Sequence, residues 1–378
     1  MIYLDHNATT PIAPEALDAM LPFLRERWGN PSSMHRFGSE LHREIEKARG
    51  RVADLIGADP SEIVFTGCGT ESTNAAIRGA WEAMGERGTI ITSRVEHPCV
   101  QKPCRYLKER GAQLVELRVN HDGQIDLDEL RKCVAAEPTL VSLMWANNET
   151  GVMFRMNEIA SIVKDAGSVL HTDAVQVAGK VPINVGEVPI DLLSLSGHKL
   201  NAPKGVGVLY VRRGTRLTPF IQGGSHEGGR RGGTLNVPFI IGLGVACHLA
   251  NIDDMQTRVR GLRDKLENEL LRACPDAFVN GDGDHRLPNT TNITFPGLEG
   301  ESFLYHLDDA GIAASSGAAC SSGKMEASHV ILAMGVPAHQ AKGAIRFSLG
   351  VSNTAAEIDE AVARIAGILA GQYEPIRH

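Results

Sequence analysis

The pattern of apolar and polar positions changes character near residue 62. Beyond this point, short apolar runs alternate with amphipathic segments of helical length. The alternation predicts an α/β fold, in which a mostly parallel seven-stranded sheet lies between helices. In such sheets, ligands bind beyond the carboxyl ends of the strands. The predicted strands are residues 63–65, 89–92, 114–119, 140–145, 169–171, 192–195 and 206–211.

The N-terminal part of the chain is predicted to be an extended arm followed by two helices. Pro14 suits a first helical turn, and this helix is predicted to run to about residue 27. A loop at residues 29–33 separates it from a longer helix. The apolar positions of the longer helix recur at four- and three-residue steps, which places them on one face: Leu41, Ile45, Ala48, Val52 and Leu55.

After about residue 250 the pattern indicates a smaller α+β domain, which begins with a long charged helix at residues 254–273. We therefore expect three parts. An arm at residues 1–15 joins the small domain, residues 16–253 form the large domain, and residues 254–378 form the small C-terminal domain. Further strands of the small domain are predicted at 277–280, 290–295 and 344–348, and further helices at 301–310 and 355–369.

Composition and charge narrow the class of protein. Of the 378 residues, 43% are hydrophobic and 22% are charged, which is typical of a soluble globular protein. The net charge of −7 and the lack of a Lys/Arg block argue against nucleic-acid binding. The N-terminus has no secretory pattern, and the most apolar stretch, residues 237–246, is interrupted by Gly242 and Gly244 and is too short to span a bilayer. We expect neither nucleic acid nor a membrane as a partner.

The seven cysteines are odd in number and widely spread, so they do not resemble a disulfide framework. No pair has the spacing of a zinc site, and no intrinsic metal site is predicted. Free thiols indicate a reducing, cytoplasmic setting. Cys133, Cys247 and Cys274 fall in helical stretches and are predicted to be packed small hydrophobes.

A glycine-rich turn at residues 66–72 follows the first predicted strand and leads into a helix. Backbone N–H groups and the helix dipole at such a helix start favour a phosphate. The alternative is an ordinary helix N-cap formed by Thr70, and the turn alone does not decide between the two. The turn is not a Walker loop, and it is not a dinucleotide-binding GxGxxG because Ser72 replaces the third glycine.

Polar side chains follow several other predicted strands. Taken singly, each is better explained as an ordinary loop residue. Together they converge on one edge of the sheet, where they supply a lysine, a carboxylate, a histidine and two amides. This inventory fits pyridoxal phosphate, which needs a lysine for its Schiff base, an acid beside its pyridine nitrogen and an anion site for its phosphate. The residues are His97, Asn147, Asn148, Asp173, Gln176, Ser196, His198 and Lys199.

From about residue 3 to residue 368, the chain resembles the class V aminotransferase group of fold-type-I pyridoxal-phosphate enzymes. Within that group it is similar to the NifS/IscS-type cysteine desulfurases, and residues 142–145 resemble the nitrogen-fixation NifS branch. The resemblance implies a large domain that binds the cofactor and a small domain that carries a catalytic cysteine. Motifs that carry it lie at residues 7–10, 29–33, 69–72, 96–98, 146–151, 171–176, 197–199, 202–207, 315–320 and 345–348.

The resemblance implies a role for each matching residue. Lys199 would hold the cofactor covalently and later move the proton at Cα of the substrate. His97 would stack on the pyridine ring and assist the acid–base steps. Asp173 would pair with the ring nitrogen, and Gln176 would hydrogen-bond the phenolic oxygen.

The resemblance also implies how the cofactor phosphate and the substrate are held. Arg346 would bind the substrate carboxylate together with Asn148, which also contacts the cofactor, because an arginine suits a bidentate carboxylate clamp. Thr234 would reach the phosphate in the neighbouring subunit, which makes the enzyme a homodimer. The other phosphate-binding residues would be Gly69, Thr70, Ser196 and His198.

Residues 315–323 consist only of Ser, Gly and Ala apart from Cys320, which is the composition of a flexible loop. A single loop cysteine is weak evidence for catalysis. The resemblance makes Cys320 the nucleophile that takes sulfur from L-cysteine as a persulfide and leaves L-alanine. The sulfur would pass to an iron–sulfur scaffold protein or another acceptor, for general cluster assembly or for nitrogenase. A cluster shared between Cys320 and that scaffold is the one metal site left open.

Alternative functions on the same scaffold are a selenocysteine lyase and another class V transferase. Cys320 in its flexible segment argues against an aminotransferase. A third alternative is a catalytically silent relative that binds partners, and the presence of Lys199, Asp173, His97 and Arg346 argues against it.

The sequence departs from the family pattern in two places. His6 replaces a common Asn, and the loop at residues 223–234 lacks its usual Gln, Arg and Ser. The departures leave the core chemistry intact and concern the loop between subunits. Two further cysteines are interpreted as structural: Cys99, which follows His97 and Pro98, and Cys68, whose backbone would be what contributes to the phosphate turn.

Overall fold

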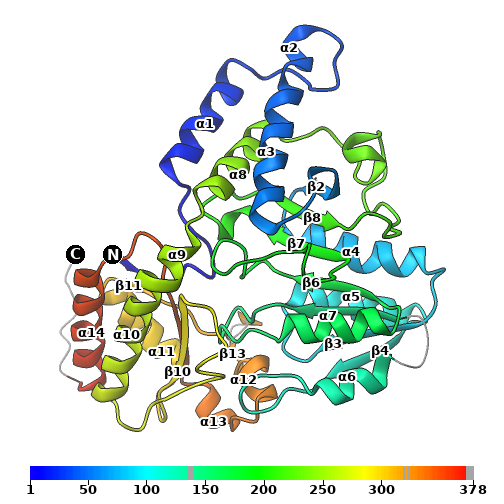
Figure 1. The fold of residues 1–378 in the computed structure, drawn as a ribbon. Coiled ribbons are helices and arrows are strands. Elements are labelled where there is room, and N and C mark those ends of the chain that lie inside the picture. The colour runs from blue at the N-terminus through cyan, green and yellow to red at the C-terminus, as the bar shows by residue number, and fades with distance from the viewer. Residues whose placement is uncertain (135–138, 318–319, 322–323, 372–378) are drawn as a thin grey trace.

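The computed structural model describes residues 1–134, 139–317, 320–321 and 324–371. A seven-stranded sheet forms the centre of the large domain (Figure 1). β8 runs antiparallel to its two neighbours, β2 and β7, and all other neighbours are parallel, so the predicted mostly parallel sheet is confirmed. In spatial order the strands are β2 (Ile63–Thr66), β8 (Gly207–Val211), β7 (Leu192–Ser196), β6 (Val169–Asp173), β5 (Thr139–Met144), β3 (Thr89–Ser93) and β4 (Gln113–Leu117).

Helices cover both faces of this sheet, and alternate residues of each strand face opposite layers. In β2, Val64 packs with α4 and α5, whereas Ile63 and Phe65 pack in the cluster that includes α3, α7 and α8. Burial on both faces explains why the strands read as continuous apolar runs. The helices of this domain are α1 (Pro14–Arg25), α2 (Arg36–Ser39), α3 (Leu41–Ile56), α4 (Gly69–Ala83), α5 (Pro98–Glu109), α6 (Leu127–Val134), α7 (Met156–Asp165) and α8 (Val237–Leu249).

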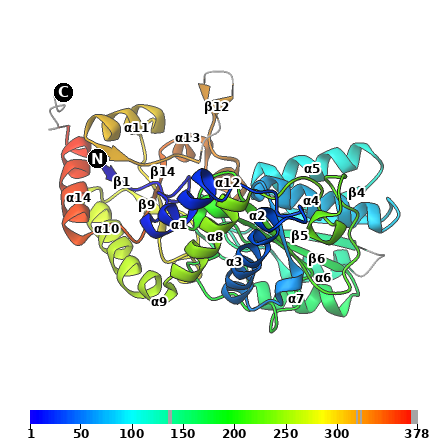
Figure 2. The same ribbon diagram turned by 90° about the horizontal axis from the view of Figure 1, so that it is seen from above.

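A second apolar core belongs to the C-terminal part of the chain, which lies beside the large domain in both views (Figures 1 and 2). Its antiparallel sheet has the order β14 (Ala344–Ser348), β10 (Thr290–Thr294) and β9 (Phe278–Val279). The predicted long helix at 254–273 is interrupted by a π-helical turn at Met255–Val259, between α9 (Ile252–Asp254) and α10 (Arg260–Ala273). The other helices are α11 (Gly300–Asp309), α12 (His329–Ala333), α13 (Ala338–Ala341) and α14 (Ala355–Leu369).

The N-terminal arm crosses from the small core to the large domain. Its strand β1 (Ile2–Tyr3) pairs in parallel with β11 (Ile312–Ala313), and Ile2 and Leu4 are buried in the small core. Further along, the N–H of Thr10 donates to the carbonyl of His198 at 2.9 Å. The arm is therefore packed against both parts of the chain.

Among the described residues, no single helix is long and apolar enough to cross a membrane, although α8 and the helical run Ile252–Ala273, bent by 59°, pass the criteria of length and composition together.

Candidate active site

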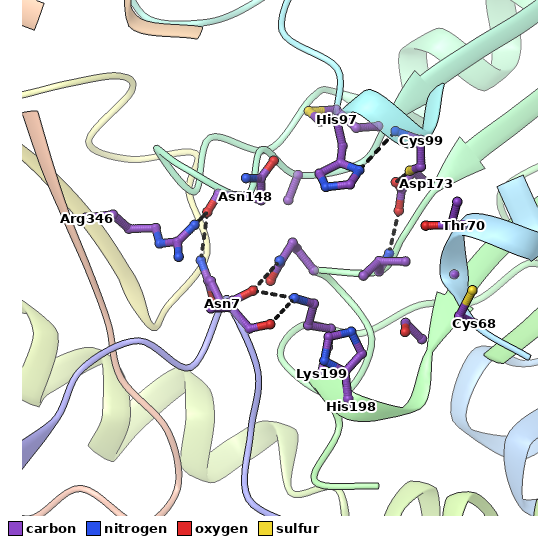
Figure 3. A pocket seen from close by; sticks show the side chains of 17 residues that line it. Asn7, Cys68, Thr70, His97, Cys99, Asn148, Asp173, His198, Lys199 and Arg346 are labelled. Atoms are coloured by element: carbon purple, nitrogen blue, oxygen red, sulfur yellow. Dashed lines mark hydrogen bonds between the residues drawn. The ribbon is translucent and has the colours of Figure 1, made fainter. Parts of the chain in front are cut away.

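The carboxyl ends of β5, β6 and β7 open into a cavity of about 400 Å³ (Figure 3). The start of α4 and the residue before α5 line one part of it, and Asn7 of the arm and Arg346 of β14 line another. The polar residues that follow these strands therefore meet at one edge of the sheet, as predicted. The predicted site residues on its wall are Gly69, Thr70, His97, Asn148, Asp173, Gln176, Ser196, His198, Lys199 and Arg346.

Lys199 ends a short 3₁₀ turn that directly follows β7. The turn is tight at Gly197, where an added Cβ would lie 2.8 Å from Val206. The ammonium group of Lys199 donates to the main-chain carbonyls of Asn7 and Ala8, both at 2.6 Å. Burial, helped by the positive charge of Arg346, lowers the pKa of Lys199 to about 8. A readily deprotonated amine is what covalent attachment to a carbonyl group requires.

Asp173 is the last residue of β6 and is buried beside the cavity. Its Oδ1 accepts the N–H of Val175 at 2.9 Å, and its Oδ2 lies 3.5 Å from the sulfur of Cys99, whose thiol donates. Burial raises the pKa of Asp173, although the N–H of Val175 and the neighbouring His97 oppose the rise. If a cationic ring nitrogen lay against this carboxylate, the two opposite charges would stabilise each other.

His97 is the N-cap of α5, and its Nδ1 accepts the N–H of Cys99 at 3.1 Å. An accepting Nδ1 places the proton of the neutral ring on Nε2. Burial lowers the pKa of His97, against the opposing charge of Asp173. The imidazole is therefore neutral and held in one tautomer at the cavity wall.

The turn before α4 places Gly69 and Thr70 on the cavity wall. The N-cap of α4 is Cys68, whose sulfur accepts the N–H of Glu71 at 3.4 Å, so the alternative in which Thr70 is the N-cap is wrong. The side chain of Cys68 therefore caps α4, and the contribution of its backbone to a phosphate site stays a prediction. An added Cβ at Gly69 would lie 3.0 Å from Cγ2 of Val175 and 3.1 Å from Cβ of Ser196, so this position is tightly packed. Burial lowers the pKa of His198 to about 4, so that its ring is neutral.

Arg346 of β14, the predicted carboxylate clamp, lies on the cavity wall. Its guanidinium donates to the main-chain carbonyl of Asn148 at 2.9 Å and forms an ion pair with Asp5 at 2.6 Å. Its Nε is buried and has no hydrogen-bond partner among the described residues. The contact of Arg346 with Asn148 is thus made through the backbone, and Asp5 balances the arginine charge.

Gln176 is oriented by a lysine outside the cavity wall. Its Oε1 accepts from Nζ of Lys180 at 3.0 Å, and its Nε2 donates to the carbonyl of Asn7 at 3.0 Å. The amide oxygen therefore faces Lys180, and the amide nitrogen faces the arm. Sequence reasoning gave no role to Lys180.

Among the described residues of the wall, seven were not predicted as site residues, and Asn7, Ala8 and Cys99 are three of them. Asn7 and Ala8 belong to a motif that carried the family resemblance, which was the available signal. Cys99 was interpreted as structural, yet it lies on the wall against Asp173. Burial raises the pKa of its thiol, so the thiol is uncharged.

Of the other two predicted residues, Thr234 does not line this wall, and only the backbone of Cys320 is described. Thr234 is exposed, on a loop that a buried bidentate pair between Glu227 and Arg49, at 2.8 Å, fixes to α3. The backbone of Cys320 is described in β12 (Cys320–Ser321), which pairs with β13 (Lys324–Met325). The side chain of Cys320 lies outside the described part of the chain.

Comparison with known proteins defines the class first. The family model "Aminotransferase class-V" matches residues 2–361, so the chain belongs to the class-V aminotransferase family. Among its relatives are a cysteine desulfurase of Gluconacetobacter diazotrophicus, 51% identical over 98% of this chain and 93% of the relative, and the cysteine desulfurase NifS of Azotobacter vinelandii, 50% identical over 98% and 92%. A solved NifS-like protein superposes with a TM-score of 0.92 at 37% identity, covering 98% of this chain and 99% of that one. The predicted family and fold are confirmed.

Proposed function

We propose that this chain is a pyridoxal-phosphate-dependent cysteine desulfurase, which converts L-cysteine to L-alanine and retains the sulfur as a persulfide on Cys320. The observation that supports this most directly is that Lys199, Asp173, His97 and Arg346 line one cavity in a chain half identical to cysteine desulfurases. A selenocysteine lyase or another class V transferase is not favoured, because these relatives carry the cysteine desulfurase name.

The residues present fit pyridoxal phosphate. Lys199 offers an amine with a lowered pKa, Asp173 offers a buried carboxylate, and a side chain at Gly69 would fill the space beside Ser196. When bound, the cofactor supplies an electron sink for the bonds at Cα of the substrate. The remaining contacts that we assign are stacking by His97, donation to the phenolic oxygen by Gln176, and phosphate binding by Gly69, Thr70, Ser196, His198 and Thr234 of a second copy.

In the proposed reaction, this chain's own residues bind the substrate, move its proton and take its sulfur. Arg346 and Asn148 hold the carboxylate of L-cysteine, with Asp5 released from the guanidinium. Lys199 takes the proton from Cα and returns it at the end of the reaction. The Cys320 thiolate attacks the substrate sulfur, and the bond between that sulfur and Cβ breaks. The electron pair stays on the three-carbon fragment, which takes up a proton and leaves as L-alanine, while Cys320 keeps the sulfur as a persulfide.

The persulfide needs an acceptor, and we propose an iron–sulfur scaffold protein, with general cluster assembly and nitrogenase assembly as the two uses. The similarity to NifS of Azotobacter vinelandii supports the second use. We further propose a homodimer and a reducing, cytoplasmic setting. Every cysteine whose side chain is described is free, which agrees with that setting.

The decisive experiment is mass spectrometry of the peptide that contains Cys320 after the purified protein has met L-cysteine. We expect the mass of one added sulfur, together with release of alanine in equal amount. The Cys320→Ala variant should keep the cofactor absorbance and lose sulfide release in the presence of a thiol. Full sulfide release by Cys320→Ala would refute the persulfide mechanism, and faster turnover of L-selenocysteine by this variant would favour a lyase.

A further inference from the structure

Glu149 contacts both ends of the segment that carries Cys320. At one end, a Cβ on Gly317 would overlap the carboxylate of Glu149, so the main chain of this glycine lies directly against it. At the other end, the hydroxyl of Ser328 donates to Oε2 of Glu149 at 2.5 Å. One buried carboxylate therefore touches both stems of residues 317–328.

The bond from Ser328 has only one possible direction. Its oxygen accepts the N–H groups of Val330 and Ile331 at 3.1 and 3.3 Å, where it caps α12. The single hydroxyl proton is then left for Glu149. This makes Glu149 the acceptor that fixes the second stem.

Glu149 itself is held from both domains, by Asn147 of its own turn and by Asn292 of β10. Its N–H donates to Oδ1 of Asn147 at 2.8 Å, its carbonyl accepts from Asn292 at 3.3 Å, and its side chain is buried. The preceding residue, Asn148, accepts from Arg346 through its carbonyl at 2.9 Å. Adjacent residues of one rigid turn thus hold the substrate-binding arginine and the stems of the cysteine segment.

The first stem has a further tie to the same arginine. The N–H of Arg346 donates to the carbonyl of Ser315 at 2.6 Å, and the N–H of Ser315 donates back at 3.2 Å. The position of the segment is therefore defined relative to Arg346 on both sides.

We propose that Glu149 is a positioning residue for Cys320: its carboxyl fixes both stems of the segment, so that the thiol reaches a substrate held by Arg346. This inference rests on the proposed function. Burial raises the pKa of Glu149 to about 7, while the hydroxyl of Ser328 and the charge of Arg346 oppose the rise. The positioning role requires a hydrogen-bond acceptor of this size and does not require a negative charge. A glutamine at position 149 should therefore keep the role.

The test measures persulfide formation on Cys320 by rapid mixing with L-cysteine and mass spectrometry. Glu149→Ala and Ser328→Ala should slow this step, by on the order of 10- to 100-fold for Glu149→Ala, because small displacements of a reacting group cost that much. Glu149→Gln should restore most of the rate. Glu326→Ala, which removes an exposed carboxylate of the same segment, is the matched control and should react as the unmodified protein does.

A second readout does not depend on catalysis. Alkylation of Cys320 by iodoacetamide, without L-cysteine, should change in rate in Glu149→Ala and return in Glu149→Gln. Cofactor content and the change in cofactor absorbance on L-cysteine addition should stay as in the unmodified protein. Gly317→Ala should also slow persulfide formation, and adding it to Glu149→Ala should cost little more, because the overlapping carboxylate is gone.

The outcomes separate this inference from the proposed function. Unchanged persulfide and alkylation rates in Glu149→Ala, or no recovery in Glu149→Gln, would overturn the positioning role. Loss of cofactor together with persulfide formation would show a general structural role and would overturn it too. If the unmodified protein forms no persulfide, the proposed function fails, while the alkylation rates still decide whether Glu149 fixes the segment.

Discussion

At the scale of single residues, the site places charged groups in surroundings where charge is disfavoured. Lys180 is buried and Lys199 is partly buried, and burial lowers the pKa of Lys199 to about 8 and that of Lys180 to about 7. Lys199 faces two carbonyls of the arm, and Lys180 faces the backbone and side-chain oxygens of Gln176. Carbonyl oxygens leave these amines able to lose a proton, whereas carboxylates would hold them charged.

Lys180 has a measurable effect on how stability depends on pH. Between pH 7 and 10.5 the unfolded chain protonates Lys180 and the folded chain does not, so proton binding favours unfolding and stability rises with pH across this window. Lys180→Met lacks this dependence. The unmodified protein should therefore gain up to a few kcal/mol over Lys180→Met from pH 6.5 to 9.5, at about 1.4 kcal/mol per pKa unit.

Urea denaturation of the cofactor-free proteins at the two pH values measures this difference. The exposed Lys132→Met variant controls for the loss of a surface charge. A constant difference between Lys180→Met and the unmodified protein at both pH values would show that Lys180 does not release its proton on folding.

At the scale of elements, apolar runs predicted the sheet because its strands are buried on both faces. The antiparallel direction of β8 was not predictable, since a buried strand reads alike in both directions. The residues at strand ends were predictable because the chain order places them at one edge. Asn7 and Cys99 were not predictable as site residues. Asn7 contacts Lys199, which lies more than half of the chain away in sequence. Cys99 contacts Asp173 only because of the way α5 packs.

The glycines of α8 are a second case in which the sequence did not predict the packing. Gly242 and Gly244 read as interruptions of an apolar stretch, yet α8 is continuous through them. A Cβ at Gly244 would lie 2.6 Å from Cα of Ala48 on α3, so the glycine permits a close helix contact. Packing between helices, which the sequence does not display, decides their role.

Gly244→Ala should therefore lower the free energy of unfolding by about 1–3 kcal/mol, because α3 and α8 must move apart. Gly261→Ala is the matched control, since Gly261 lies within α10 and a Cβ there would have no neighbour within 4 Å. It should raise stability by up to about 1 kcal/mol, from helix propensity alone. Chemical denaturation of both variants measures the contrast, and equal effects would mean that the helix contact is not tight.

At the scale of the whole molecule, the N-terminal arm packs against both domains, and residues of both domains line the one cavity described above. The arm places Asp5 against Arg346 and Asn7 against Lys199, so substrate-binding and cofactor-binding groups share one segment.

Mixed dimers test whether Thr234 acts in the site of the other subunit. A dimer of one Lys199→Ala chain and one Thr234→Val chain should contain one intact site, with Lys199 from one copy and Thr234 from the other. It should bind one cofactor as tightly as the unmodified protein and show half of its activity.

The reference is a dimer of the unmodified chain with the double variant Lys199→Ala/Thr234→Val, whose only lysine-containing site lacks the threonine hydroxyl. That dimer should bind the cofactor more weakly, by roughly the value of a charge-assisted hydrogen bond, about 1.5–3 kcal/mol. Cofactor titration of the two separately tagged and purified mixed dimers makes the comparison, and the reverse order of affinities would place Thr234 in the site of its own chain.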